Sequence, residues 1–572
     1  MQYRYHHPIS INRLSRRLIS AALLLCFFTS LQAQEVDFTS SNLPIVVIDT
    51  RGQHIPYDNP RIRADMGIIW NGPGERNEIT DPFNDYDGMI SIEIRGASSS
   101  GWSKKSYSIE TEKPDSSNNN VSLLGLPKEN DWVLYAPYYD RSLMRNVLTY
   151  HLAREWGWYA PRTRFCELVL NGDYQGVYVL TEKIKRDKNR VAIKKMDNDD
   201  NAGDSLTGGY IFKVDKEPWK PGFDGRYKPD PDDDLLTRYQ YVYPKADRIT
   251  PSQEDYISHY FWSFEDAIHS NHPHDTTNGY PAYLNVASFV DNYIINELSK
   301  NVDGYRLSSY YYKDRDSRGG KITAGPVWDY NFSFGNVAYY HAERAGEWNL
   351  QYLISPHFLH GGDPFLVPSW WDPLIHDSLF VEEVIRRWHE LRQSLLTPET
   401  INAFIDAVAD TLDEAKDRNF TIWPGPGDPK LPGDGWFPPM GPTEHFTSYA
   451  DEISYLKSWT AQRITWIDNN IEHLRDGATP PDTGPLKFWL GQNIPNPVIT
   501  TTTIHYELLY QNHVVLTLYS LTGRRIAVLV DELQPRGKYN VTWSPHGLPA
   551  GIYLYELRAG PFRAVKKLSV VR

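Results

Sequence analysis

Two aspartates, Asp303 and Asp329, stand where their carboxylates could do chemistry together. Between them the sequence predicts two strands, 308–313 and 321–328, joined by a polar turn that ends in glycine. In an antiparallel pair, residues equidistant from the turn face each other, and the midpoint of the two aspartates lies in this turn. Both should therefore emerge at the open end of the hairpin. Such a pair either binds a divalent cation or divides acid and base roles; the alternative is two turn residues that hydrogen-bond nearby backbone.

A helix must position the first of these aspartates. Residues 284–300 carry apolar side chains at helical spacing, and Asn285 can cap the start. Asp291, Asn292 and Glu297 fall on the side predicted to be wetter. The helix should end just before Asp303.

The loop 96–103 is a second place where chemistry is possible, because its small residues leave backbone N–H groups open. Strands are predicted on both sides, and the return strand places Lys105 on the apolar face with Tyr107 and Ile109, with Lys104 pointing to solvent. A lysine on an apolar face is costly unless its charge is paired. Lys105 could hold phosphates beside this loop; the alternative is a strand-end lysine whose ammonium reaches water.

Other charged groups give weaker indications. Glu182 follows a predicted hairpin, where it could pair across a site or face water. The acidic stretch 228–234 lacks the ligand spacing of an EF-hand loop and is interpreted as a solvated insertion. Cys166, the only cysteine outside the first 33 residues, is predicted to be packed. The net charge of -13 argues against nucleic acid as a partner.

The two ends of the chain differ from its middle. Residues 1–33 predict a secretory signal peptide, because arginines precede an apolar run too short to span a bilayer. No later run predicts a membrane helix. Residues 476–487 have the composition of a linker, so we expect domains at 43–475 and 488–572. The second carries short alternating strands at the spacing of a β-sandwich.

Residues 488–572 resemble the type A sorting domain of the type IX secretion system. The resemblance lies in residues 492–497 (QNIPNP), 522–524 (TGR) and 548–555 (LPAGIYLY). It implies an Ig-like sandwich, and export first by the Sec machinery and then by the type IX machinery. It also implies a secreted or cell-surface location.

Residues 43–474 resemble the CotH kinase family, the spore-coat protein H-like atypical kinases. The matching pieces are 95–99 with 104–107, 140–146, 160–163, 170–172, 176–178, 180–184, 208–210, 301–303 and 325–329. The resemblance implies an α+β, diverged protein-kinase-like fold that uses ATP and Mg²⁺ or Mn²⁺ to phosphorylate Ser or Thr of secreted or surface proteins. Carried over by motif, Asp303 would be catalytic, Asp329 would bind metal, Lys105 would contact nucleotide phosphates, and Glu182 would orient Lys105.

Two departures leave a second function open. Ser308 stands where a kinase-like catalytic loop has a metal-binding Asn, and Asn331 stands where many members have an acidic residue. Both predict a weaker metal site. The chain is therefore either an exported kinase or a catalytically silent surface protein, structural or adhesive, on a kinase-like scaffold. A different transfer, such as AMPylation, is a third possibility.

Overall fold

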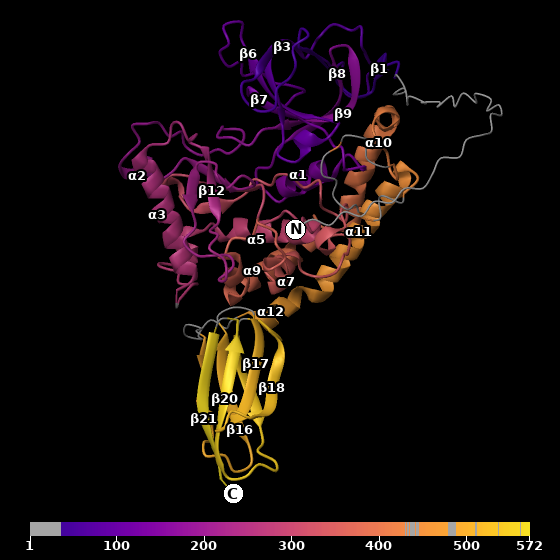
Figure 1. Ribbon diagram of the computed structural model, residues 1–572. Coiled ribbons are helices and arrows are strands. Elements are labelled where there is room, and N and C mark those ends of the chain that lie inside the picture. Colours follow the sequence, from indigo (N-terminus) through magenta and orange to yellow (C-terminus); the bar gives the residue numbers. More distant parts are fainter. Residues whose placement is uncertain are drawn as a thin grey trace, which may run out of the picture.

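The structure, a computed structural model, describes residues 36–270, 272–428, 431, 434, 441, 446–478, 488–508, 512–535, 537–560 and 562–571. The predicted signal peptide and residues 479–487 of the predicted linker lie outside these residues. The described chain mixes helix and sheet, as the α+β prediction requires (Figure 1).

A closed barrel forms the first part (Figure 1). In spatial order its strands are β2 (Ile45–Asp49), β3 (Ile62–Ile69), β5 (Tyr86–Arg95), β6 (Ser106–Glu112), β7 (Asp131–Tyr135), β9 (Asp173–Glu182) and β8 (Thr163–Leu170). Alternate side chains such as Ile90, Ile92 and Ile109 pack into its core. Because side chains alternate along a strand, Glu93 and Arg95 point to the other face of β5.

The second part is an antiparallel sheet with helices around it. In order, the sheet holds β11 (Gly222–Asp224), β12 (Arg238–Tyr243), β10 (Tyr210–Val214), β13 (Ser309–Lys313) and β14 (Ile322–Ala324). The long helices are α1 (Arg145–Glu155), α3 (Pro251–Ile268), α5 (Val286–Ser299), α9 (Ser378–Arg392), α10 (Pro398–Ile422) and α11 (Tyr449–Asn470). Short elements are β1 (Ser40–Ser41), β4 (Asn77–Glu78), α2 (Gly203–Leu206), α4 (Tyr280–Tyr283), α6 (Asn349–Leu353), α7 (Pro356–Leu359), α8 (Trp371–Ile375) and α12 (Leu474–Gly477).

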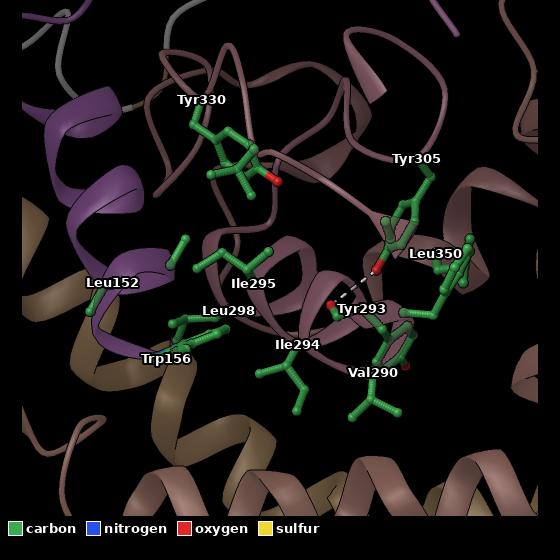
Figure 2. Packing of buried hydrophobic residues seen from close by; sticks show 14 of the residues in the cluster. Leu152, Trp156, Val290, Tyr293, Ile294, Ile295, Leu298, Tyr305, Tyr330 and Leu350 are labelled. Carbon is green, nitrogen blue, oxygen red and sulfur yellow. Dashed lines mark hydrogen bonds between the residues drawn. The ribbon is translucent and has the colours of Figure 1, made fainter. Parts of the chain in front are cut away.

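Helix α5 lies at the centre of this part. Figure 2 shows side chains of α1 and of the segment after α5, including Leu152, Tyr305 and Tyr330, gathered around it. The prediction of a wetter side was wrong for Asp291 and Glu297, which are buried. Glu297 is accommodated because it pairs with buried Arg463 at 3.1 Å and accepts the N–H of Leu350. Asn285 occupies the N-cap position, but its side chain makes no capping hydrogen bond.

The C-terminal strands form two sheets with their own core, which confirms the predicted sandwich. One sheet holds β15 (Trp489–Leu490), β16 (Thr502–Leu508) and β19 (Gly537–Trp543). The other holds β18 (Arg525–Gln534), β17 (Asn512–Ser520), β20 (Gly551–Ala559) and β21 (Phe562–Val570). None of the described helices is both long enough and apolar enough to cross a membrane.

One buried carboxyl in α3 should make stability depend on pH. Glu265 is 1% exposed, and burial raises its pKa from 4.5 to about 8. A group with a raised folded-state pKa stabilises the fold below its unfolded pKa and loses that contribution as pH rises through the folded value. Glu265→Gln should therefore increase the free energy of unfolding relative to wild type as pH rises from 4.5 to 8, by about 3–4 kcal/mol at pH 8.

Urea unfolding at pH 5 and pH 8 measures this difference. Glu254→Gln, on the exposed side of the same helix, is the matched control and should change neither value by more than about 0.5 kcal/mol. Equal free energies of unfolding for wild type and Glu265→Gln at pH 8 would contradict the prediction, because they would show that neighbouring groups stabilise the buried Glu265 carboxylate.

Candidate active site

A cavity of about 360 Å³ lies between the outer face of the barrel and the second part of the fold. Its volume falls within the range of small-molecule sites, which is roughly 300–1,000 Å³. The barrel contributes β5, the loop after it, β6, β7 and β9, and the second part contributes the ends of β10 and β13 and the segment 328–332. The cavity thus collects residues that are more than 200 positions apart in the chain.

Asp303 and Asp329 both line this cavity, so the hairpin brings them together as the sequence predicts. The register differs from the prediction. Lys313 pairs with Ile322, whereas a turn centred on residue 316 would pair it with residue 319. The two aspartates still meet, because each lies beyond the short paired region, where the loops after α5 and β14 turn into the same cavity.

The backbone of Asp329 is held in an unusual conformation. Its φ is +66°, the left-handed region that non-glycine residues seldom adopt. Helix α1 holds it there: the Asp329 N–H donates to Tyr150 Oη at 3.2 Å, and the Tyr330 N–H donates to Asn146 Oδ1 at 2.6 Å. Strained residues of this kind persist only where the surroundings fix them, and they concentrate at functional sites.

The Asp329 carboxylate has no ion-pair partner among the described residues. Its side chain keeps exposed surface within the cavity, and desolvation by the cavity walls raises its pKa to about 6. Nearby Asp303 and Asp215 raise that pKa further, whereas Lys216 and Arg95 lower it. No lysine or arginine in the described part of the chain forms an ion pair with Asp329. A divalent cation would supply the missing positive charge.

Asp303 is anchored on one side. Its Oδ1 accepts a hydrogen bond from Arg306 at 3.2 Å, and its N–H donates to Asn301 Oδ1. Arg306 is itself buried and fixed, because it also pairs with Asp363 at 3.0 Å. The Asp303 carboxylate is therefore oriented while it remains part of the cavity wall.

The remaining ligand candidates are oxygen donors. Ser308, with a φ of +48°, and Asn331 both line the cavity. Asp215 lines it too, directly after β10, whose Val214 pairs with Ser309 of β13. Carboxylate, amide and hydroxyl oxygens are the ligands that Mg²⁺ and Mn²⁺ prefer, so this donor set fits such a metal.

Residues 92–467, more than half of the chain, match the family described as CotH kinase protein. The chain belongs to the CotH kinase protein family. Residues 494–571 match the secretion system C-terminal sorting domain, which indicates secretion to the cell surface. A comparison with curated proteins found no match.

Lys105, which the sequence predicts to bind phosphate, does not line the cavity. Lys105 Nζ donates to the carbonyls of Ser100 and Trp102, within the loop after β5. The predicted orientations of the two lysines were wrong, because Lys104 is the buried one, at 1% exposure. It donates to Val177 O at 2.6 Å and to Asn419 Oδ1 of α10 at 2.7 Å. These acceptors compensate the ammonium that the apolar surroundings disfavour.

Glu182 does not contact Lys105, the residue that it is predicted to orient. It is fully buried and accepts hydrogen bonds from Arg162 at 2.9 Å and from Tyr159. Arg162 and Arg190 are its ion-pair partners within the described chain, and Lys105 is not among them. The structure therefore does not bring the predicted Lys105–Glu182 pair together.

Several charged residues of the cavity escaped the sequence reasoning as site residues, among them Arg95, Lys213, Asp215 and Lys216. A signal was present, since three of the four residues 213–216 (KVDK) are charged. Only the pairing of β10 with β13 shows that this strand end lies beside the loop that follows Asp303.

The acidic stretch 228–234 is mostly exposed, as predicted, but Asp230 is buried. Asp230, Asp232 and His360 place one ligand atom each within 4.8 Å of one another. This group does not line the cavity.

Cys166 is buried, which confirms the prediction that it is packed, and burial raises its pKa to about 12.

Proposed function

We propose that this protein transfers the γ-phosphoryl group of ATP to a Ser or Thr hydroxyl of a secreted or surface protein, with Mg²⁺ or Mn²⁺. The observation that carries the proposal is the Asp329 carboxylate, which has no ion-pair partner among the described residues, beside Asp303 in a cavity that the loop 96–99 also lines. Membership of the CotH kinase protein family supports the same reaction.

In this proposal Asp303 accepts the proton of the acceptor hydroxyl. The hydroxyl oxygen bonds to the γ-phosphorus, the bond from that phosphorus to the bridging oxygen breaks, and ADP leaves. Asp329 would hold the metal, with Asp215, Ser308 and Asn331 as further oxygen ligands. When bound, the metal would offset negative charge on the phosphates. Arg306 keeps the Asp303 carboxylate oriented.

The kinase-like arrangement and the export route belong to the same proposal. The barrel and the helical part would be the two halves of a diverged kinase-like domain at residues 43–475, with the sorting domain at 488–572. Because ATP is scarce outside cells, phosphorylation would take place in the periplasm, after cleavage of the signal peptide and before type IX export.

Thermal denaturation of the full chain with ATP and Mg²⁺ or Mn²⁺ tests metal-dependent nucleotide binding. A ligand that binds only the native state raises the melting temperature, here by about 2–5 °C at saturating concentrations. Asp329→Asn should abolish the shift. Since the Asp329 pKa is about 6, metal binding must displace its proton below that pH, and the wild-type shift should shrink between pH 7 and pH 5.

Asp232→Asn is the matched control, because it removes a carboxylate from the exposed acidic group outside the cavity. This variant should keep the full ATP-dependent shift. A well-folded wild type with no shift in either metal would refute the kinase proposal and favour the silent surface protein. A shift lost in Asp232→Asn but kept in Asp329→Asn would place the metal outside the cavity.

A further inference from the structure

We propose that Arg95 and Lys216, in place of Lys105, form the cationic cradle that binds the polyphosphate of the nucleotide. This inference rests on the proposed function and assigns the groups that recognise the phosphates. It follows from which cations of the cavity already have a carboxylate partner and which do not.

Five cations line the cavity among the described residues: Arg95, Lys183, Lys213, Lys216 and Lys220. Three are already in ion pairs, Lys183 with Asp131 at 3.3 Å, Lys213 with Asp215, and Lys220 with Glu217. Arg95 and Lys216 have no carboxylate partner in the described part of the chain. They are the two charges left to meet an anionic ligand.

Arg95 ends β5, directly before Gly96, whose φ is +108°. Its guanidinium carbon lies 5.1 Å from the centre of the Trp328 ring, in a cation–π contact. Its Nη1 is buried and has no hydrogen-bond partner within the described chain. A buried N–H without a partner is costly, and a planar guanidinium suits two phosphate oxygens at once.

Lys216 reaches the same region from the opposite side. It follows β10, and its Nζ donates to Ser98 Oγ at 2.8 Å, so it crosses from the sheet to the loop of the barrel. Its backbone is fixed, because its N–H donates to Asp215 Oδ1 and its carbonyl accepts from Gln240 at 2.7 Å. Arg95 and Lys216 line the same cavity as Asp329, the proposed metal ligand.

Lys105 lacks these properties. Both of its hydrogen-bond acceptors are carbonyls of its own loop, Ser100 and Trp102, and it does not line the cavity. It holds the loop together, so we expect its removal to affect all ligands of the cavity alike. A lysine in contact with phosphate would instead distinguish ATP from adenosine.

Calorimetric titration of the full chain with Mg·ATP and with adenosine separates these roles. Arg95→Gln should weaken Mg·ATP binding about tenfold or more and change adenosine binding less than about threefold. Lys216→Gln should show the same selectivity, with a loss of about five- to tenfold. Lys105→Gln should change both affinities by a similar factor. Melting curves without ligand check that each variant is folded.

The outcomes separate this proposal from the function on which it rests. A wild type that binds neither ligand overturns both. A wild type that binds Mg·ATP, with Arg95→Gln and Lys216→Gln binding it equally well, overturns the cradle alone. Selective loss of Mg·ATP in Lys105→Gln, with adenosine retained, would also overturn it and return the phosphate contact to the lysine chosen from the sequence.

Discussion

Asp303→Asn should reduce phosphoryl transfer by about 10²–10⁴-fold while Mg·ATP binding stays within a factor of about three, because the amide cannot accept the acceptor's proton. The variant keeps the side-chain shape, and its amide oxygen can still accept the hydrogen bond from Arg306. The measurement is transfer of label from γ-labelled ATP to dephosphorylated casein or to the chain itself. The binding titration is run beside it, so that loss of the chemical step is distinguished from loss of ligand.

The matched control is Asp363→Asn. Asp363 contacts the same Arg306 at 3.0 Å but does not line the cavity. We expect transfer within about tenfold of wild type, because only the support of Arg306 is weakened. Transfer by Asp303→Asn above a tenth of the wild-type rate would exclude Asp303 as the proton acceptor. Loss of Mg·ATP binding in this variant would instead assign Asp303 to the metal.

Arg145→Met should lower the free energy of unfolding by about 3–5 kcal/mol. Arg145 lies at the start of α1 and pairs with Asp140 and with Glu452 of α11, each at 2.7 Å. All three side chains are fully buried. Removing the cation leaves two buried carboxylates without an ion-pair partner and without contact with water. Burial already raises the pKa of Glu452, which shows that its charged form is disfavoured there.

Chemical denaturation measures this loss, and two added substitutions identify its cause. Asp140→Asn and Glu452→Gln, combined with Arg145→Met, remove the unpaired charges and should restore more than half of the lost stability. A loss below about 1 kcal/mol in Arg145→Met alone would contradict the explanation by unpaired buried charges.

Asn146, the residue after Arg145, accepts the N–H of Tyr330 and so holds the backbone next to Asp329. We therefore also expect weaker metal binding in Arg145→Met.

Local pattern was sufficient for the strands of the C-terminal sandwich. Short alternating strands are predicted within residues 488–572, and β16 and β20 are two of them; the prediction succeeds because strand alternation and turn residues are local features of the sequence. The sequence reasoning missed β12 and α3, which lie within the second part of the fold. A start signal for α3 was present, since Thr250 and Gln253 form a capping box.

The two lysines after the barrel loop show where local pattern fails. Strand alternation assigned Lys105 to the buried face, but β6 begins at Ser106, so both lysines precede the strand. Contacts with distant residues then decide their directions. Lys104 turns inward because Asn419, 315 residues away, accepts its hydrogen bond. No window of neighbouring residues carries that information.

The sequence by itself determined the α+β class, the family, the sandwich and the meeting of Asp303 with Asp329. Each of these was predicted from local patterns or motifs along the chain, although the register of the hairpin differs from the predicted one. Only the tertiary structure decided which charges face the cavity. Arg95 ends a barrel strand and Lys216 follows a sheet strand, and both line the cavity, whereas Glu182 is buried in an ion pair with Arg162 outside it. The direction of a charged side chain depends on where a counter-charge or a polar acceptor lies in space, and folding alone brings those partners together.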